Sequence, residues 1–170
     1  MIAPTKIPSV VVGSAVGAQG FTASGEDPAL LARTPADRWL LSRLARAVNE
    51  TVRALEAFRF DDASGAFYQF VWHDLCDWYI ELSKEALSGQ DPAKKRGAQA
   101  VLAHALDTAL RLLHPIMPFV TEELWQTLKR AVGASGWAES IMVAPYPEKR
   151  AVDEAAERSF GPVIGVIDAI

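Results

Sequence analysis

The feature that most constrains the fold of this 170-residue chain is a run of large apolar residues between positions 60 and 86. They recur every three to four residues, the spacing of one face of an α-helix. This face carries Phe67, Phe70, Val71, Leu75, Trp78 and Leu82. Tyr68, Trp72 and Tyr79 widen the apolar arc to more than half the circumference, so the helix must pack against more than one neighbour. The sequence therefore predicts a central helix.

The same periodicity predicts further helices around this one. Residues 34–59 begin with Thr34-Pro35, a cap residue followed by a proline suited to a first helical position. A third helix should follow the turn at 87–92 and end near His114, and a fourth should run over residues 118–130. A last apolar pattern covers residues 160–170, while residues 140–147 are proline-bounded and should run extended. The fold class is all-α, an up-and-down bundle of four to five helices.

Two segments differ in character along the chain. Residues 1–30 are rich in glycine and serine and are expected to form a flexible or irregular lead-in. Their apolar stretch is broken by Gly13 and Gly17 and falls short of the ~18 residues that a membrane span needs, so no membrane contact is expected. Residues 31–170 form the helical domain. Its apolar pattern is unfinished at Ile170, which indicates a domain truncated at its C-terminal end.

Charge and cysteine content limit the possible functions. The net charge of −4 argues against strong non-specific binding to nucleic acid, so any RNA binding should be local and depend on shape. Cys76 is the single cysteine, so the chain forms no internal disulfide, and a reducing cytoplasm is the expected location. His73 and Cys76 are too few ligands for a structural metal site, and burial of Cys76 as a small apolar residue is expected.

One stripe of the central helix is polar where the rest is apolar. His73, Asp77, Ile80 and Lys84, spaced four, three and four, lie on the face opposite the predicted core. Ile80 is the odd member of this stripe. An apolar side chain there can be chance, a contact with another helix, or a surface on which a base packs.

A second candidate surface lies on the first helix. Trp39 projects toward the same side as Arg43 and Arg46. Guanidinium groups pair with phosphate oxygens, and both guanidinium and indole groups offer flat surfaces to unstacked bases. The alternative is that Trp39 packs against the lead-in.

Four segments resemble one family. Residues 36–44 read ADRWLLSRL and residues 60–84 read FDDASGAFYQFVWHDLCDWYIELSK. Residues 112–126 read LLHPIMPFVTEELWQ, and residues 140–147 read SIMVAPYP. In this order and separation they resemble the anticodon-binding domain of valyl-tRNA synthetases, over about residues 35–170. The run WHDLCDWY looks valyl in particular, and the equivalent domains of isoleucyl- and leucyl-tRNA synthetases are the lesser alternative.

The resemblance implies a function in RNA recognition. Such a bundle packs against the anticodon arm of valine tRNA and positions the acceptor end for a catalytic domain. Unstacked loop bases are read by hydrogen bonds and stacking, while arginines hold phosphates. The tRNA-binding candidates are His73, Asp77, Ile80, Lys84, Trp39, Arg43 and Arg46.

The departures from the family bear on activity. Neither the His-x-Gly-His nor the Lys-Met-Ser-Lys-Ser element is present, so ATP and Mg²⁺ would be used by a catalytic domain outside this chain. The chain binds no cofactor of its own in this interpretation and should not aminoacylate tRNA alone. Residues 1–30 do not resemble the Asn-Lys-x-Trp-Asn helix that precedes this point in the family, so part of the RNA surface is expected to be missing. The rival hypothesis is a free-standing truncated paralogue that binds a protein partner.

Overall fold

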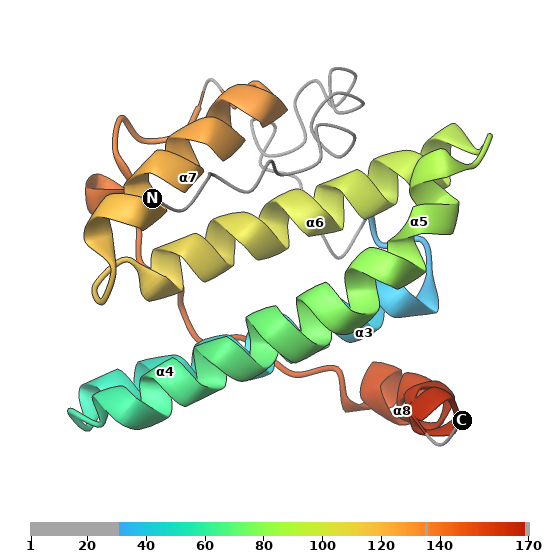
Figure 1. The fold of residues 1–170 in the computed structure, drawn as a ribbon, viewed down its shortest axis with the longest axis horizontal. Coiled ribbons are helices and arrows are strands. Elements are labelled where there is room, and N and C mark those ends of the chain that lie inside the picture. The colour runs from blue at the N-terminus through green and yellow to red at the C-terminus, as the bar shows by residue number, and fades with distance from the viewer. Residues whose placement is uncertain (1–30, 135, 169–170) are drawn as a thin grey trace, which may run out of the picture.

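A computed structural model describes residues 31–134 and 136–168, and all regular structure in that part of the chain is helical (Figure 1). This confirms the predicted all-α class. The expected lead-in at residues 1–30 lies outside the described residues.

The described residues form five helices when one long helix is counted once. That long helix (residues 60–88) joins α4, the π-helix η2 and α5 without a break. The elements in order are α3 (Pro35–Glu56), α4 (Phe60–Tyr68), η2 (Gln69–Tyr79), α5 (Ile80–Ser88), α6 (Pro92–Leu113), α7 (Pro118–Val132), the 3-10 turn η3 (Ile141–Val143) and α8 (Glu154–Asp168). In Figure 1 the long helix crosses the molecule in front of α3, α6 runs beside both, and α7 lies on the other side of α6.

Local sequence signals place the helix ends. Thr34 caps α3 in a capping box with Asp37, and Pro35 occupies the first turn. The carboxylate of Asp91 accepts two backbone N–H groups at the start of α6. Gly133 ends α7 with a φ of 63°, a left-handed conformation that costs glycine little. These ends lie close to the predicted ones, except that α6 begins at Pro92 and α8 at Glu154.

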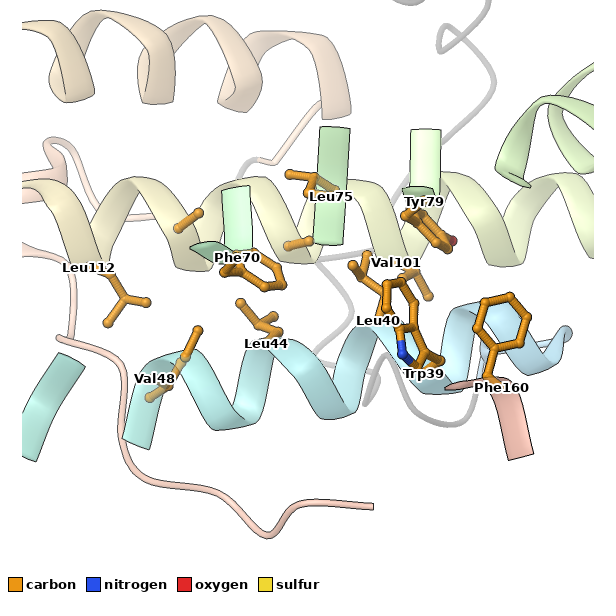
Figure 2. Packing of buried hydrophobic residues seen from close by; sticks show 13 residues of the cluster. Trp39, Leu40, Leu44, Val48, Phe70, Leu75, Tyr79, Val101, Leu112 and Phe160 are labelled. Carbon is orange, nitrogen blue, oxygen red and sulfur yellow. The ribbon is translucent and has the colours of Figure 1, made fainter. Parts of the chain in front are cut away.

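One core joins α3, η2, α6 and α8 (Figure 2). Its buried members are Trp39, Leu40, Leu44, Ala47, Val48, Phe70, Leu75, Tyr79, Val101, Ala105, Ala109, Leu112 and Phe160. The small residues of α6, such as Ala105 and Ala109, let the neighbouring backbones approach closely. A fully buried leucine such as Leu40 contributes about 1.5–3 kcal/mol relative to an exposed one.

The opposite face of α6 holds α7. Trp125 is buried, and its indole N–H donates to Oδ1 of Asp107 over 2.8 Å. Its ring stacks on Trp137 with centroids 5.0 Å apart. The buried Asp107 carboxylate thus has a hydrogen-bond donor on Oδ1 and an ion pair with Arg111 on Oδ2.

Residues 140–147 differ in part from the extended path that the sequence predicts. Ser140 accepts the N–H of Met142 and caps the η3 turn, so only the residues after Val143 are extended. Residues 144–153, here called the strap, then cross α6 and α3. Tyr146 donates to the carbonyl of Leu112, and Asn49 forms two hydrogen bonds with the backbone of Arg150. The strap brings α8 back to α3.

The buried carboxylate of Asp37 ties α3 to the long helix. Its Oδ2 accepts the N–H groups of Arg33 and Thr34, and its Oδ1 accepts the hydroxyl of Tyr79 over 2.6 Å. Burial, together with the charge of Asp37, raises the pKa of Tyr79, so Tyr79 stays a protonated donor.

Replacing Tyr79 by phenylalanine should therefore destabilise the fold. Tyr79→Phe leaves a buried carboxylate oxygen without its donor, and we expect the free energy of unfolding to fall by about 2 kcal/mol. Urea denaturation followed by circular dichroism measures this. Tyr146→Phe is the matched control, because Tyr146 is 37% exposed and its hydroxyl donates to a neutral carbonyl, that of Leu112, rather than to a carboxylate. Equal losses in the two variants would contradict a special role for Asp37.

Candidate nucleic-acid interface

The structure places the four predicted residues of the long helix in solvent. His73, Asp77, Ile80 and Lys84 are all exposed. Nδ1 of His73 lies 3.2 Å from Oδ2 of Asp77, and Nζ of Lys84 lies 2.6 Å from the carboxylate of Glu81. The predicted outward position of this stripe is therefore confirmed, while its role in binding RNA stays a prediction.

The π-helix in the middle of the long helix decides which residues face outward. Through η2 the backbone bonds run to the fifth preceding residue, as in the bond from Ile80 N–H to Leu75 carbonyl. Each turn therefore takes more residues than in an α-helix. From Gln69 onward the buried positions of the long helix are Phe70, Asp74, Leu75, Tyr79 and Ser83. Their spacing of four to five residues follows the wider turn.

This wider turn corrects the predicted apolar arc. Tyr79 is fully buried, as expected, but Tyr68 and Trp72 are exposed over 57% and 54% of their surface. Cys76 is also exposed, so its predicted burial is wrong. Partial desolvation and the charge of Asp77 raise the pKa of the Cys76 thiol, which makes it a poor nucleophile at neutral pH.

Trp39 lies in the core rather than on an open surface. Its ring centroid is 5.4 Å from that of Phe160, and α8 covers it. The expected common direction of Trp39, Arg43 and Arg46 is confirmed, because all three side chains face α8. The flat indole surface expected for a base is covered in this structure by Phe160 (Figure 2).

Both arginines are engaged by carboxylates in what we call the α8 network. Nε of Arg43 lies 2.9 Å from Oδ2 of Asp74 on η2, and Nη2 of Arg46 lies 2.9 Å from Oε2 of Glu157 on α8. Ser42 donates to Oε1 of Glu157 over 2.7 Å. The network fastens η2 and α8 to α3, so these guanidinium groups already have structural partners.

The pKa values of the two acids of this network are shifted in opposite directions. Burial raises the pKa of Asp74, and the hydrogen bond and charge of Arg43 only partly oppose it. Burial also opposes ionisation of Glu157, but hydrogen bonds from Ser42 and Arg46 outweigh it and hold the pKa of Glu157 below its ordinary value.

Two hollows border these elements. A cavity of about 510 Å³ lies between α3, α6 and the strap, but Arg38, Arg111 and Lys149 on its wall pair with Asp153, Asp107 and Glu56. A second hollow of about 410 Å³ lies beside the exposed stripe. Its wall is formed by Gln69, His73, Asp74, Asp77, Trp78 and Ile164. The second hollow presents amide, imidazole and carboxylate groups, which suit hydrogen bonding to a base edge.

Metal sites and membrane-spanning helices were the other features sought in the described ranges. Residues 31–134 and 136–168 contain no group of three or more His, Cys, Asp or Glu side chains placed to hold a metal ion. Among the helices that the structure describes, none is both long and apolar enough to cross a membrane.

Comparison with known proteins gives a consistent result. Residues 37–170 match the family model described as the anticodon-binding domain of tRNA ligase. The chain is 52% identical to a valine–tRNA ligase of Geobacter sulfurreducens over 143 residues, which is 82% of this chain. It is 45% identical to the same ligase of Lactiplantibacillus plantarum over 85% of the chain, and 46% identical to that of Syntrophotalea carbinolica over 87%. The chain spans only 16–17% of the length of these relatives.

The α8 network should make the docking of α8 dependent on pH. Because the folded pKa of Glu157 is lowered, its stabilisation is complete above its ordinary value of 4.5 and is lost as pH falls through and below that value. We expect the urea midpoint of the wild-type chain to drop between pH 5 and pH 3, and to drop less in Glu157→Gln. The urea midpoint of Glu157→Gln should still fall somewhat with pH. The reason is Asp153, whose pKa is also lowered, by the Ala156 N–H and Arg38.

Asp74→Asn is the control, because it should change the pH dependence of stability in the opposite direction. The raised pKa of Asp74 means that its protonation favours the folded state as pH falls, so removing it should steepen the acid loss. A shallower loss in Asp74→Asn would contradict this description of the network.

Proposed function

Because the chain belongs to the anticodon-binding domain family of tRNA ligases, we propose that it binds the anticodon arm of a valine tRNA. The observation that carries this proposal is the 45–52% identity to three valine–tRNA ligases over 82–87% of the chain. The exposed stripe of the long helix supports it, since imidazole, carboxylate and ammonium groups stand there in solvent. The equivalent domain of an isoleucyl- or leucyl-tRNA ligase is the lesser alternative.

In this proposal the chain recognises RNA by contact rather than by chemistry. Unpaired loop bases offer edges that His73 and Asp77 can hydrogen-bond, and Lys84 can approach a phosphate. Binding then positions the acceptor end for a catalytic domain elsewhere in the ligase, which would use ATP and Mg²⁺ in the cytoplasm. The chain itself would use no cofactor.

Arg43 and Arg46 can join this surface only in part. Their side chains are exposed over 26% and 40%, and both are held near Glu157. A phosphate would have to compete with that carboxylate, so we propose Arg46 as the more accessible of the two. Trp39 would need α8 to move before a base could reach it.

A second surface favours contact with protein. Met117 at the N-cap of α7, together with Val120 and Leu124 within it, forms an exposed apolar stripe beside the exposed Phe119. Their three-to-four spacing marks one helix face, and such stripes are typical of protein interfaces. We propose the catalytic part of the ligase as its occupant, because the chain matches only 16–17% of its relatives' length. In a free-standing paralogue the same stripe would bind another protein.

Titration with hairpin RNAs tests the main proposal. The hairpins carry the stem of valine tRNA and differ only in the three anticodon bases. We expect the valine anticodon to bind about tenfold more tightly than unrelated ones, because mismatched base edges leave polar groups unpaired. Equal affinity for every hairpin would contradict anticodon recognition, and no binding to any of them would contradict RNA binding by this chain.

A phosphate contact of Lys84 can be tested by the salt dependence of RNA binding. Lys84→Ala should weaken binding to all hairpins about equally and lower the slope of log affinity against log salt by about 1. Arg158→Ala on α8 is the matched control, since Arg158 is also exposed and also paired with an acid on its own helix. A normal salt slope in Lys84→Ala would remove Lys84 from the interface.

A further inference from the structure

Two exposed aromatic rings lie next to the stripe of the long helix and have no part in the function described so far. Tyr68 and Trp72 stack with their ring centroids 6.1 Å apart and their planes only 7° from parallel. Both rings are more than half exposed. Because the rings already hold each other in place, a third flat ring can stack on them with little further loss of side-chain freedom.

The groups beside this aromatic pair are polar. His73 meets the ring of Tyr68 edge-on, with centroids 6.1 Å apart and an interplanar angle of 80°. His73 also lines the 410 Å³ hollow together with Gln69 and Asp77. Stacking faces and hydrogen-bonding groups thus adjoin each other, which is what recognition of an unpaired base requires.

We propose that Tyr68 and Trp72 form a stacking platform for one unpaired base of the bound RNA, with its edge directed toward Gln69, His73 and Asp77. This inference rests on the proposed function and adds a residue pair to its binding surface.

Charge favours a base over a phosphate at this position. The nearest Lys or Arg side chains along the sequence are Arg59, nine residues before Tyr68, and Lys84, twelve residues after Trp72. Stacking does not require counterion release, so the contribution of the platform should depend little on salt.

The character of the surface favours a base over a protein partner. The stripe on α7 is largely aliphatic, as Met117, Val120 and Leu124 show, and offers no parallel ring pair. The platform instead combines two parallel rings with an amide, an imidazole and a carboxylate. An aliphatic protein side chain would offer these polar groups no hydrogen bond, whereas a base edge would offer them both donors and acceptors.

The test compares the full chain with three variants against the hairpin of the valine anticodon. Trp72→Leu keeps apolar area but removes the ring, so affinity should fall about tenfold with an unchanged salt slope. Trp72→Phe keeps a ring and should retain most of the affinity. Phe119→Leu is the matched control, since Phe119 is 91% exposed on α7 and should be without effect. Circular dichroism melts confirm that each variant is folded.

A fluorescent base identifies the partner directly. 2-Aminopurine is placed at each loop position of the hairpin in turn, and stacking on the indole should quench its emission at one position. That quenching should be absent in Trp72→Leu and present in Phe119→Leu.

The outcomes separate the two proposals. If the wild-type chain binds the hairpin and Trp72→Leu binds equally well, the platform is overturned, the proposed function stands, and protein contact is left as the use of this face. If the wild-type chain binds no hairpin, the proposed function fails and the platform fails with it.

Discussion

The buried carboxylate of Asp37 is the interaction on which the rest of the bundle depends. A charged group in the core must have its oxygens satisfied, and Asp37 meets this need with two backbone N–H groups of its own helix start and the hydroxyl of Tyr79. These partners fix where α3 begins and where the long helix crosses it. The α8 network repeats the arrangement, since Arg43 satisfies the buried Asp74, five residues before Tyr79.

Holding both Asp74 and Tyr79 inward requires the π-winding of η2. Five residues separate these two, and a π turn returns the chain to the same face after about that number. The same winding carries Tyr68, Trp72 and Cys76 outward, although their residue types favour burial. The interior hydrogen bonds therefore determine the exterior surface, and π-helical segments are frequent at functional sites for this kind of reason.

The sequence predicts most of the fold because helix ends and apolar periodicity are local signals. Thr34-Pro35 and Gly133 mark ends that the structure reproduces. The sequence does not predict the π-helix, because the apolar residues of the long helix recur at the spacing of an ordinary α-helix. The wider turn depends on tertiary partners, which the local sequence does not show. Nor does it predict that α8 covers Trp39 and binds Arg46, since that contact joins residues more than a hundred positions apart.

These findings explain how a chain of net charge −4 can still suit RNA. Several of its basic side chains form ion pairs with acids of the same chain, as Arg43, Arg46 and Arg111 do. Weak attraction to phosphates lowers affinity for any RNA, but it also lowers affinity for the wrong RNA, whereas stacking and edge hydrogen bonds act only where bases are unpaired. In the proposed function, a surface built on such contacts would select a loop over a duplex, and the pairing of basic residues inside the bundle would favour that selectivity.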